Sequence, residues 1–170
     1  VQVLAMKYID VFNGDADGIC ALIQLRLAEP RQAELVTGIK RDIELLNQVQ
    51  DGRDSNITVL DISFEKNAKD IERLLAQGAH INYIDHHQTG DIKQHPNLTT
   101  HIDLDANTCT SLIVDKLLNG QYRAWAITAA FGDNLLAAAT VLAQQSGFTE
   151  QDTETMKQLG KLQWLRCKYR

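Results

Sequence analysis

The sequence has few of the residues that mark disulfide-rich, disordered or membrane-spanning proteins. Only two of its 170 residues are proline, which excludes a proline-rich disordered or fibrous chain. No interval is apolar over the roughly 20 residues that cross a bilayer, so we expect no membrane partner. The three cysteines, Cys20, Cys109 and Cys167, lie far apart without a CxxC pair. Because no secretory signal peptide is visible either, we expect a cytoplasmic protein with reduced thiols.

Positive charge is also scarce, since 17 lysines and arginines stand against 22 acidic residues, for a net charge of −5. This balance argues against a broad electrostatic grip on long duplex nucleic acid, although a short or localised contact is compatible with it. Hydrophobic residues make up 44% and charged residues 23% of the sequence, as in ordinary globular proteins. We expect one domain with its own core over residues 6–150. Residues 151–170 are expected to form a C-terminal helix or tail, a candidate start of a second lobe.

Strand-like and helix-like hydrophobic patterns alternate along the chain. β-Branched and aromatic runs predict strands at residues 7–13, 35–37, 57–62 and 81–85, and an alternating run predicts a half-buried edge strand at 98–104. Apolar residues at helical spacing predict helices at residues 19–29, 40–48, 64–77, 109–118 and 125–142, and a last helix from 149. Because parallel strands need crossover connections, this alternation predicts an α/β fold, a mostly parallel sheet with helices on both faces.

Acidic and imidazole side chains follow the predicted strands. Those at or just beyond strand ends are Asp15, Asp17, Asp61, Asp85 and His86. Since the carboxyl ends of parallel strands share one edge of a sheet, we expect these side chains to meet there. A hard divalent cation lets several carboxylates share a small volume, and mixed carboxylate and imidazole ligands favour manganese, iron or zinc over calcium. Such a cluster suits two metals, which activate water and hold both oxygens of an in-line phosphoryl displacement.

Four short motifs, in this order, resemble those of the DHH phosphoesterases. They are residues 13–18 (NGDADG), 59–61 (VLD), 85–87 (DHH) and 131–134 (FGDN). This superfamily includes manganese-dependent inorganic pyrophosphatases, RecJ-type single-strand exonucleases, nanoRNA hydrolases and cyclic dinucleotide hydrolases. The resemblance covers residues 8–134 and implies a Rossmann-like domain that hydrolyses phosphoester or phosphoanhydride bonds. The implied substrate is a short oligonucleotide, a nucleotide or another phosphorylated small molecule, and a homodimer is compatible with it.

The resemblance implies two metal ions per site, Mn²⁺ by preference, with Mg²⁺ or another divalent ion as the alternative. Asp15 would bind the first ion, while Asp17 and His86 would bind the second. Asp61 and Asp133 would bridge the two ions or contact both. A ligand role would explain why an acid stands inside the apolar run at 125–142, and a break between two helices is the alternative.

Other polar residues are assigned to the substrate or to support. By the same resemblance His87 would face the phosphate, and Asp85 would orient the neighbouring imidazoles rather than bind metal. Lys40 and Arg41, in the first turn of a predicted helix, are candidates for holding a substrate phosphate, and a solvated helix start is the alternative. The helix start at 107–111 could offer backbone N–H groups to an anion or form an ordinary cap.

Two features depart from the family pattern. Many members carry a histidine four residues before the first acid of the first motif, where this chain has Val11, so Asn13 is a candidate additional ligand. The family also usually has a second, C-terminal lobe, whereas this chain ends soon after the fourth motif. These departures motivate an alternative, a metal- or nucleotide-binding module without turnover. Another alternative is a haloacid-dehalogenase-like phosphatase with Asp15 as nucleophile, although Ile19 stands at its expected threonine.

Overall fold

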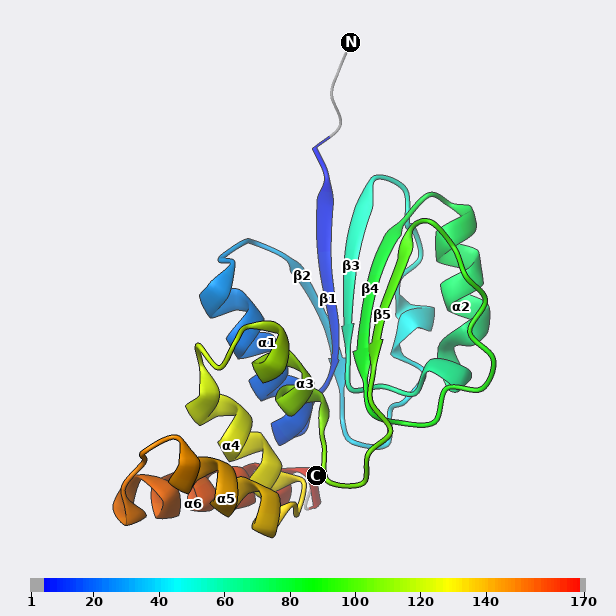
Figure 1. Ribbon diagram of the computed structural model, residues 1–170. Coiled ribbons are helices and arrows are strands. Elements are labelled where there is room, and N and C mark those ends of the chain that lie inside the picture. The colour runs from blue at the N-terminus through cyan, green and yellow to red at the C-terminus, as the bar shows by residue number, and fades with distance from the viewer. Residues whose placement is uncertain (1–4, 169–170) are drawn as a thin grey trace.

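Five parallel strands form the sheet that the sequence predicts, which confirms the α/β fold (Figure 1). The computed structural model describes residues 5–168, and side-chain surroundings up to residue 162. The strands are β1 (Lys7–Asn13), β2 (Glu34–Gly38), β3 (Ser55–Leu60), β4 (His80–Asp85) and β5 (Leu98–Ile102). Their order across the sheet is β2-β1-β3-β4-β5, so β5 is an edge strand, as predicted. All carboxyl ends therefore lie along one edge.

Helices cover both faces of the sheet. They are α1 (Ala16–Ala28), the short 3₁₀ helix η1 (Leu45–Gln48), α2 (Phe64–Ala76), α3 (Thr110–Leu117), α4 (Arg123–Gly132), α5 (Leu136–Gln145) and α6 (Glu150–Lys168). In Figure 1, α2 lies on one face, while α1 and α3 lie on the other. Helix α4 packs on α1 and α3, and α5 and α6 pack on α4. No helix within residues 5–168 is long and apolar enough to cross a membrane.

The strands bury side chains on both faces, as parallel strands with helices on each side must. On β1, Ile9 and Val11 pack into the core beneath α2, and Phe12 packs into the core beneath α1 and α3. On β4, Tyr83 likewise packs into the core beneath α2, and Ile84 packs into the core beneath α1 and α3. This two-sided burial explains why the strand segments are nearly continuous hydrophobic runs.

The predicted helix at residues 40–48 is wrong, because only the 3₁₀ helix η1 forms there. The backbone N–H of Ile39 donates to the Asp42 carboxylate at 3.1 Å, and the Asp42 N–H donates to the Ile39 carbonyl at 2.8 Å. An aspartate that bonds nearby backbone groups favours a turn over a helix. Lys40 therefore lies in a turn directly after β2 and not in the first turn of a helix.

The apolar run at residues 125–142 forms two helices with a break between them. Helix α4 ends at Gly132, α5 begins at Leu136, and Asn134 takes the left-handed conformation with φ of 63°. The N–H of Leu135 donates to the Ala130 carbonyl, which closes the end of α4. The break places Asp133 just beyond α4.

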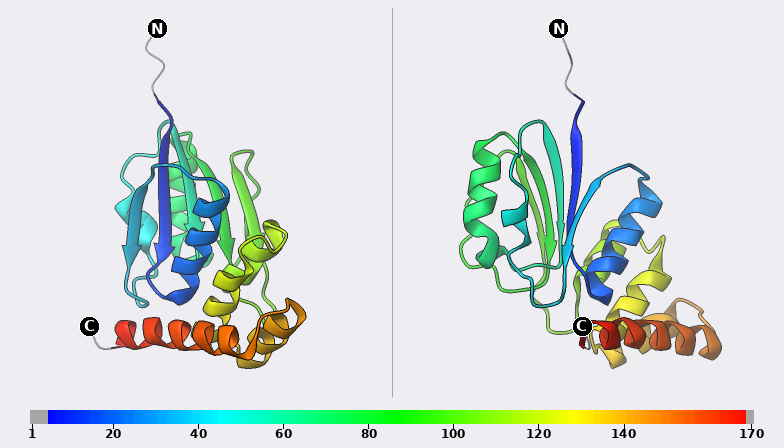
Figure 2. Two further views of the ribbon diagram at one scale, coloured as in Figure 1. Left: turned by 90° about the vertical axis from the view of Figure 1, so that its left-hand side faces the viewer. Right: turned by 180° about the vertical axis from the view of Figure 1, so that it is seen from behind.

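Helix α6 fits tightly against α4. Figure 2 shows α6 lying across the end of the molecule to which the strand arrowheads point. A Cβ atom added at Gly160 would collide with the backbone of Thr128 and Gly132, and one added at Gly132 would collide with Ala16 of α1. Small residues thus let three helices approach closely. The predicted division of the chain into residues 6–150 and 151–170 stays a prediction. Residues 169–170 lie outside the described part of the chain.

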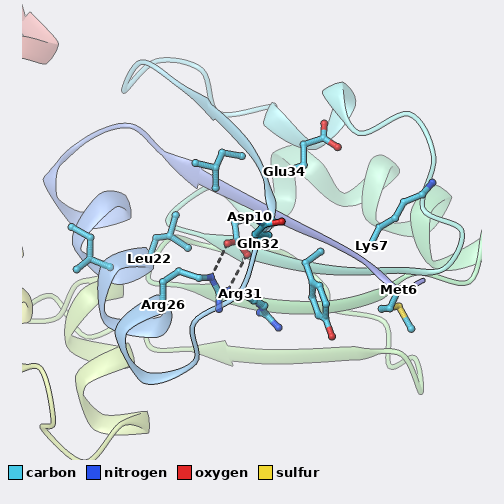
Figure 3. A pocket seen from close by; sticks show the side chains of 12 residues that line it. Met6, Lys7, Asp10, Leu22, Arg26, Arg31, Gln32 and Glu34 are labelled. Carbon is cyan, nitrogen blue, oxygen red and sulfur yellow. Dashed lines mark hydrogen bonds and ion pairs between the residues drawn. The ribbon is translucent and has the colours of Figure 1, made fainter. Parts of the chain in front are cut away.

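A buried ion pair interrupts the apolar surface of β1. Asp10 is fully buried, and its carboxylate accepts hydrogen bonds from Arg26 Nε at 2.8 Å and Nη2 at 3.0 Å. The pair borders a pocket of about 830 Å³ between α1 and β2, shown in Figure 3. In the same pocket the Arg31 guanidinium lies 4.6 Å from the centre of the Tyr8 ring. None of the predicted site acids lines this pocket.

Candidate metal centre

Asp61 follows β3 directly and is nearly fully buried at the carboxyl edge of the sheet. Its backbone is left-handed, with φ of 60°, and its N–H donates to the Ile84 carbonyl at 3.1 Å. The Thr110 hydroxyl donates to Asp61 Oδ1 at 3.1 Å. A non-glycine residue in this conformation is uncommon, because Cβ crowds the backbone. The turn after β3 therefore directs this carboxylate toward the other strand ends at a conformational cost.

The first motif places two acids at the start of α1. Asp15 caps the helix, and its Oδ1 accepts hydrogen bonds from the N–H groups of Asp17 and Gly18 at 3.1 and 3.2 Å. Asp17, in the first turn, is buried and accepts hydrogen bonds from the N–H groups of Thr110 and Ser111 at 2.8 and 2.7 Å. Helix N-termini stabilise negative charge. Of the two alternatives for the start of α3, an anion site or an ordinary cap, the backbone N–H groups there bind an anion of the same chain, the Asp17 carboxylate.

The third motif follows β4 and brings an imidazole to these acids. His86 Nε2 lies 3.3 Å from Asp61 Oδ1, 3.7 Å from Asp17 Oδ2 and 3.9 Å from Asp133 Oδ2. The predicted residues Asp17, Asp61, His86 and Asp133 are therefore brought together from four separate segments. A single cation between them could accept ligand atoms from both the imidazole and the carboxylates.

His87 and Asp85 form a separate pair beside this cluster. His87 Nδ1 and Asp85 Oδ1 are 2.6 Å apart, and the other Asp85 oxygen is buried without a hydrogen-bond partner among the described residues. The His87 side chain is 46% exposed, whereas that of Asp85 is fully buried. The hydrogen bond to Asp85 raises the pKa of His87 above its ordinary value. Asp85 therefore orients His87, which is half open to solvent.

Of the remaining predicted site residues, Lys40 and Asn13 lie beside the acids and Arg41 does not. Lys40 Nζ lies 3.1 Å from Asp15 Oδ2 and 3.8 Å from Asp133 Oδ1. Asn13 is buried and its side-chain oxygen accepts the Asp15 N–H at 3.2 Å. Arg41 is exposed and does not line the pocket at the acids. Val11, at the position of the usual family histidine, is fully buried in the core beneath α2.

Burial and neighbouring carboxylates raise the pKa values of Asp61 and Asp133. Burial, followed by the charges of Asp17, Asp15 and Asp85, raises the pKa of Asp61 well above its ordinary value. Burial and the Asp17 charge raise the pKa of Asp133 to about 6. Although burial opposes its charge, Lys40 has a raised pKa because the Asp15 carboxylate stabilises the ammonium group. Without a cation other than Lys40, negative charge is costly here.

The donor atoms suit a divalent metal ion. Two groups have ligand atoms within 4.8 Å of one another, Asp61 with His86 and His87, and Asp17 with His86 and Asp133. Asp85 Oδ1 lies 2.6 Å from Nδ1 of one of these imidazoles, that of His87, as in metal sites where a carboxylate fixes a histidine ligand. Carboxylate and imidazole donors together suit manganese, iron or zinc.

A pocket of about 410 Å³ opens beside these groups. Its lining includes Asp15, Lys40, Asp61, His86, His87 and Asp133, together with Asn13, Ser63, Glu65, Lys66 and Gln88 among others. Sequence reasoning missed Lys66 and Gln88 as pocket residues, and it missed the hydroxyl of Thr110 on Asp61. Gln88 directly follows the third motif, and that adjacency was the signal available for it. Thr110 gave no signal of which acid it would contact.

Affinity for a divalent metal ion should fall as the pH is lowered through about 6, because Asp133 then becomes protonated. The raised pKa of Asp61 adds to this loss, since its carboxylate must also be charged to bind metal. Calorimetric titration of Mn²⁺ between about pH 5 and about pH 7.5 measures the effect. The Asp133→Asn variant should bind more weakly at neutral pH and show a shallower pH dependence. An affinity that is constant over this range would contradict the arrangement.

Together, the parallel sheet and the acid and imidazole cluster at its carboxyl edge define an α/β domain with a candidate metal centre. The model of the DHH family, N-terminal domain, matches residues 9–142. The chain belongs to this family, which confirms the resemblance in its four motifs and leaves the haloacid-dehalogenase-like alternative without support.

Comparison with solved and curated proteins adds little to the family assignment. Sixteen chains of solved structures match, and one of them is from the crystal structure of an uncharacterized protein from Helicobacter pylori G27. It shares 16% sequence identity and a TM-score of 0.46, and the match covers 93% of this chain and 62% of that one. The chain thus spans less than two thirds of that structure. No curated protein matches.

Proposed function

We propose that the chain is a divalent-metal-dependent phosphoesterase domain that hydrolyses phosphoester or phosphoanhydride bonds. The observation that carries this proposal is the convergence of Asp17, Asp61, Asp133 and His86 within a member of the DHH family. The proposed substrate is a short oligonucleotide, a nucleotide or another phosphorylated small molecule, and the proposed ion is manganese. The adjoining pocket, of about 410 Å³, falls in the size range of small-molecule sites.

The four clustered residues would hold the metal, and their surroundings prepare them for it. The N-terminus of α3 orients Asp17 through backbone N–H groups, so this carboxylate does not have to reorganise during binding. A bound divalent ion would supply a water nucleophile at neutral pH and neutralise charge on the phosphate. The protein residues supply orientation, since each acid is fixed by a separate element of the fold.

His87 would act on the substrate side. Its Nδ1 is held by Asp85 at 2.6 Å, which leaves Nε2 for a phosphate oxygen. The hydrogen bond to Asp85 raises the pKa of His87, so the ring keeps a proton to a higher pH and can donate a hydrogen bond or transfer that proton to a leaving oxygen. General acid catalysis of this kind contributes roughly 10²–10⁴-fold to a rate.

Replacing His87 by asparagine should lower kcat by roughly 10²–10⁴-fold while Mn²⁺ still binds. Replacing His86 by asparagine should remove both metal binding and hydrolysis, because its ring nitrogen lies among the acids. Turnover of pyrophosphate, p-nitrophenyl phosphoesters and short oligonucleotides is measured with added Mn²⁺. His80→Asn is the matched control, since His80 is exposed at the start of β4, far along the strand from the centre.

The assay also separates the proposal from a binding module that has lost turnover. That alternative predicts that the intact chain binds Mn²⁺ or a nucleotide and hydrolyses none of the three substrates. Hydrolysis that survives His86→Asn would mean that the activity belongs elsewhere. A chain that binds no divalent ion would remove the basis of the proposal.

A further inference from the structure

The ammonium group of Lys40 occupies one side of the acidic cluster. It bridges Asp15 and Asp133, at 3.1 Å from an oxygen of the first and 3.8 Å from an oxygen of the second. We propose that Lys40 permanently takes the place of one of the two cations, so that the centre holds a single divalent ion beside it. This inference rests on the proposed metal-dependent function and replaces the two-ion site that the family resemblance implies.

Both carboxylate oxygens of Asp15 already have partners within the chain. Its Oδ1 accepts hydrogen bonds from two backbone N–H groups at the start of α1, and its Oδ2 pairs with Lys40. The neighbouring Asn13 oxygen is occupied by the Asp15 N–H. Val11, the side chain two residues before Asn13, is buried in the core and offers no donor atom. A second ion at Asp15 would have to share the neighbouring Asp61 and Asp133 carboxylates with the first ion, and it would have to displace a charged amine.

The backbone holds Lys40 in position for this role. The N–H of Gly14 donates to the Gly38 carbonyl at 3.0 Å, which joins the first motif to the end of β2. Two residues beyond Gly38, the turn closed by Asp42 and Ile39 fixes the main chain around Lys40. The side chain is half exposed, so its contact with Asp15 is set by the turn and by charge rather than by burial.

The groups able to bind a metal form one centre on the other side of the cluster. Both groups of His, Cys, Asp or Glu ligands found among the described residues contain His86, and neither contains Asp15. Two overlapping groups that share an imidazole describe a single ion position better than two separate ones. Ions in dinuclear hydrolytic sites lie roughly 3.5–4 Å apart. They can share a bridging carboxylate, but one imidazole nitrogen binds only one of them. In this chain the ion pair of Lys40 with Asp15 stands where the ligands of a second metal ion would be.

The replacement leaves a fixed positive charge facing the pocket. Lys40 lines the pocket together with His87, so both can donate to an anionic substrate oxygen. A lysine supplies charge and hydrogen bonds but cannot activate water as a metal ion does. The single divalent ion would therefore bind at the Asp17, Asp61, His86 and Asp133 side, and Lys40 would serve as a substrate-binding cation in place of the second ion.

Manganese stoichiometry tests this inference without relying on activity. The intact chain is dialysed against Mn²⁺, bound metal is counted by elemental analysis, and electron paramagnetic resonance detects whether ions are magnetically coupled. Wild type should bind one uncoupled ion per chain. Lys40→Met should admit a second, weaker ion, and Lys40→His should bind it more tightly because the imidazole adds a ligand beside Asp15. Lys40→Arg keeps the charge and should bind one.

Lys66→Met is the matched control, because Lys66 lines the same pocket and makes no ion pair among the described side chains. It should bind one ion, like wild type. Two coupled ions in wild type would overturn the inference while leaving metal-dependent hydrolysis intact. One ion in both Lys40→Met and Lys40→His would also overturn it, since Lys40 would not be what excludes the second ion. No ion in any variant would overturn the proposed function as well.

Discussion

Replacing Asp61 by asparagine should abolish divalent metal binding and, at the same time, raise the melting temperature of the metal-free protein. The carboxylate lies 3.3 Å from His86 at the middle of the proposed ligand set. Its loss should cost more than the roughly 10–100-fold in affinity that follows removal of a group that only supports a ligand. Asparagine can still accept the Thr110 hydrogen bond and tolerates the left-handed backbone at this position.

The rise in stability follows from the sign of the pKa shift. The pKa of Asp61 is higher in the folded protein than in the unfolded chain, so the fold loses stability as the pH rises above the unfolded pKa, and the loss is complete above the folded pKa. The gain from Asp61→Asn should grow as the pH rises above about 4, the unfolded pKa, and vanish below it, where both states are protonated. About 1 kcal/mol moves the melting temperature by roughly 2–4 °C in a chain of this size.

Asp115→Asn provides a control of the opposite sign for thermal unfolding. Asp115 is also a buried carboxylate, but it is paired with Arg123 at 3.0 Å and lies outside the acidic cluster. Its replacement should lower the melting temperature and leave Mn²⁺ affinity unchanged. If Asp61→Asn lowered the stability of the metal-free protein as well, the proposed repulsion within the cluster would be wrong.

Replacing Arg26 by methionine should cost about 3–5 kcal/mol of unfolding free energy, because it leaves a buried charge without its partner. Asp10 is fully buried within β1, and Arg26 makes two hydrogen bonds to its carboxylate. The pair lies away from the metal centre, so the folded variant should still bind Mn²⁺ with unchanged affinity. Urea unfolding measures the loss.

Two further variants show whether the loss of unfolding free energy comes from the Asp10 charge that is left without its partner. The double variant Asp10→Asn with Arg26→Met should regain most of the stability, because no buried charge remains. Arg53→Met should cost no more than about 1 kcal/mol, since Arg53 forms an exposed pair with Asp51. An Arg26→Met variant as stable as Arg53→Met would show that Asp10 does not carry a charge in the folded protein.

Much of the site could be predicted because the sequence pattern predicts where each strand ends. The β-branched runs that end at Asn13, Leu60 and Asp85 fix where strands stop, and parallel pairing brings those ends to one edge. An acid placed directly after such a run must lie near the others. The positions of Asp17, Asp61 and His86 followed from this rule alone.

The contacts that complete the site depend on packing between distant segments. The N–H groups that hold Asp17 come from the start of α3, and no local pattern pairs one helix start with a carboxylate on another. The turn that presents Lys40 was mistaken for a helix because apolar spacing suggested one, while the Asp42 hydrogen bonds that prevent it are visible only in the structure. Asp133 could be recognised as unusual, but its direction was set by how α4 packs on α1.

Because α6 packs tightly on α4, the part of the chain that supports the metal centre extends beyond the part that matches the family model. The family match stops at residue 142, yet Gly160 lies against the backbone of Thr128 and Gly132, directly before Asp133. A chain shortened to the matched region would contain every acid of the centre and lack the helix that steadies one of them. The smallest piece worth expressing or transplanting is therefore defined by this helix contact, and it extends beyond residue 160.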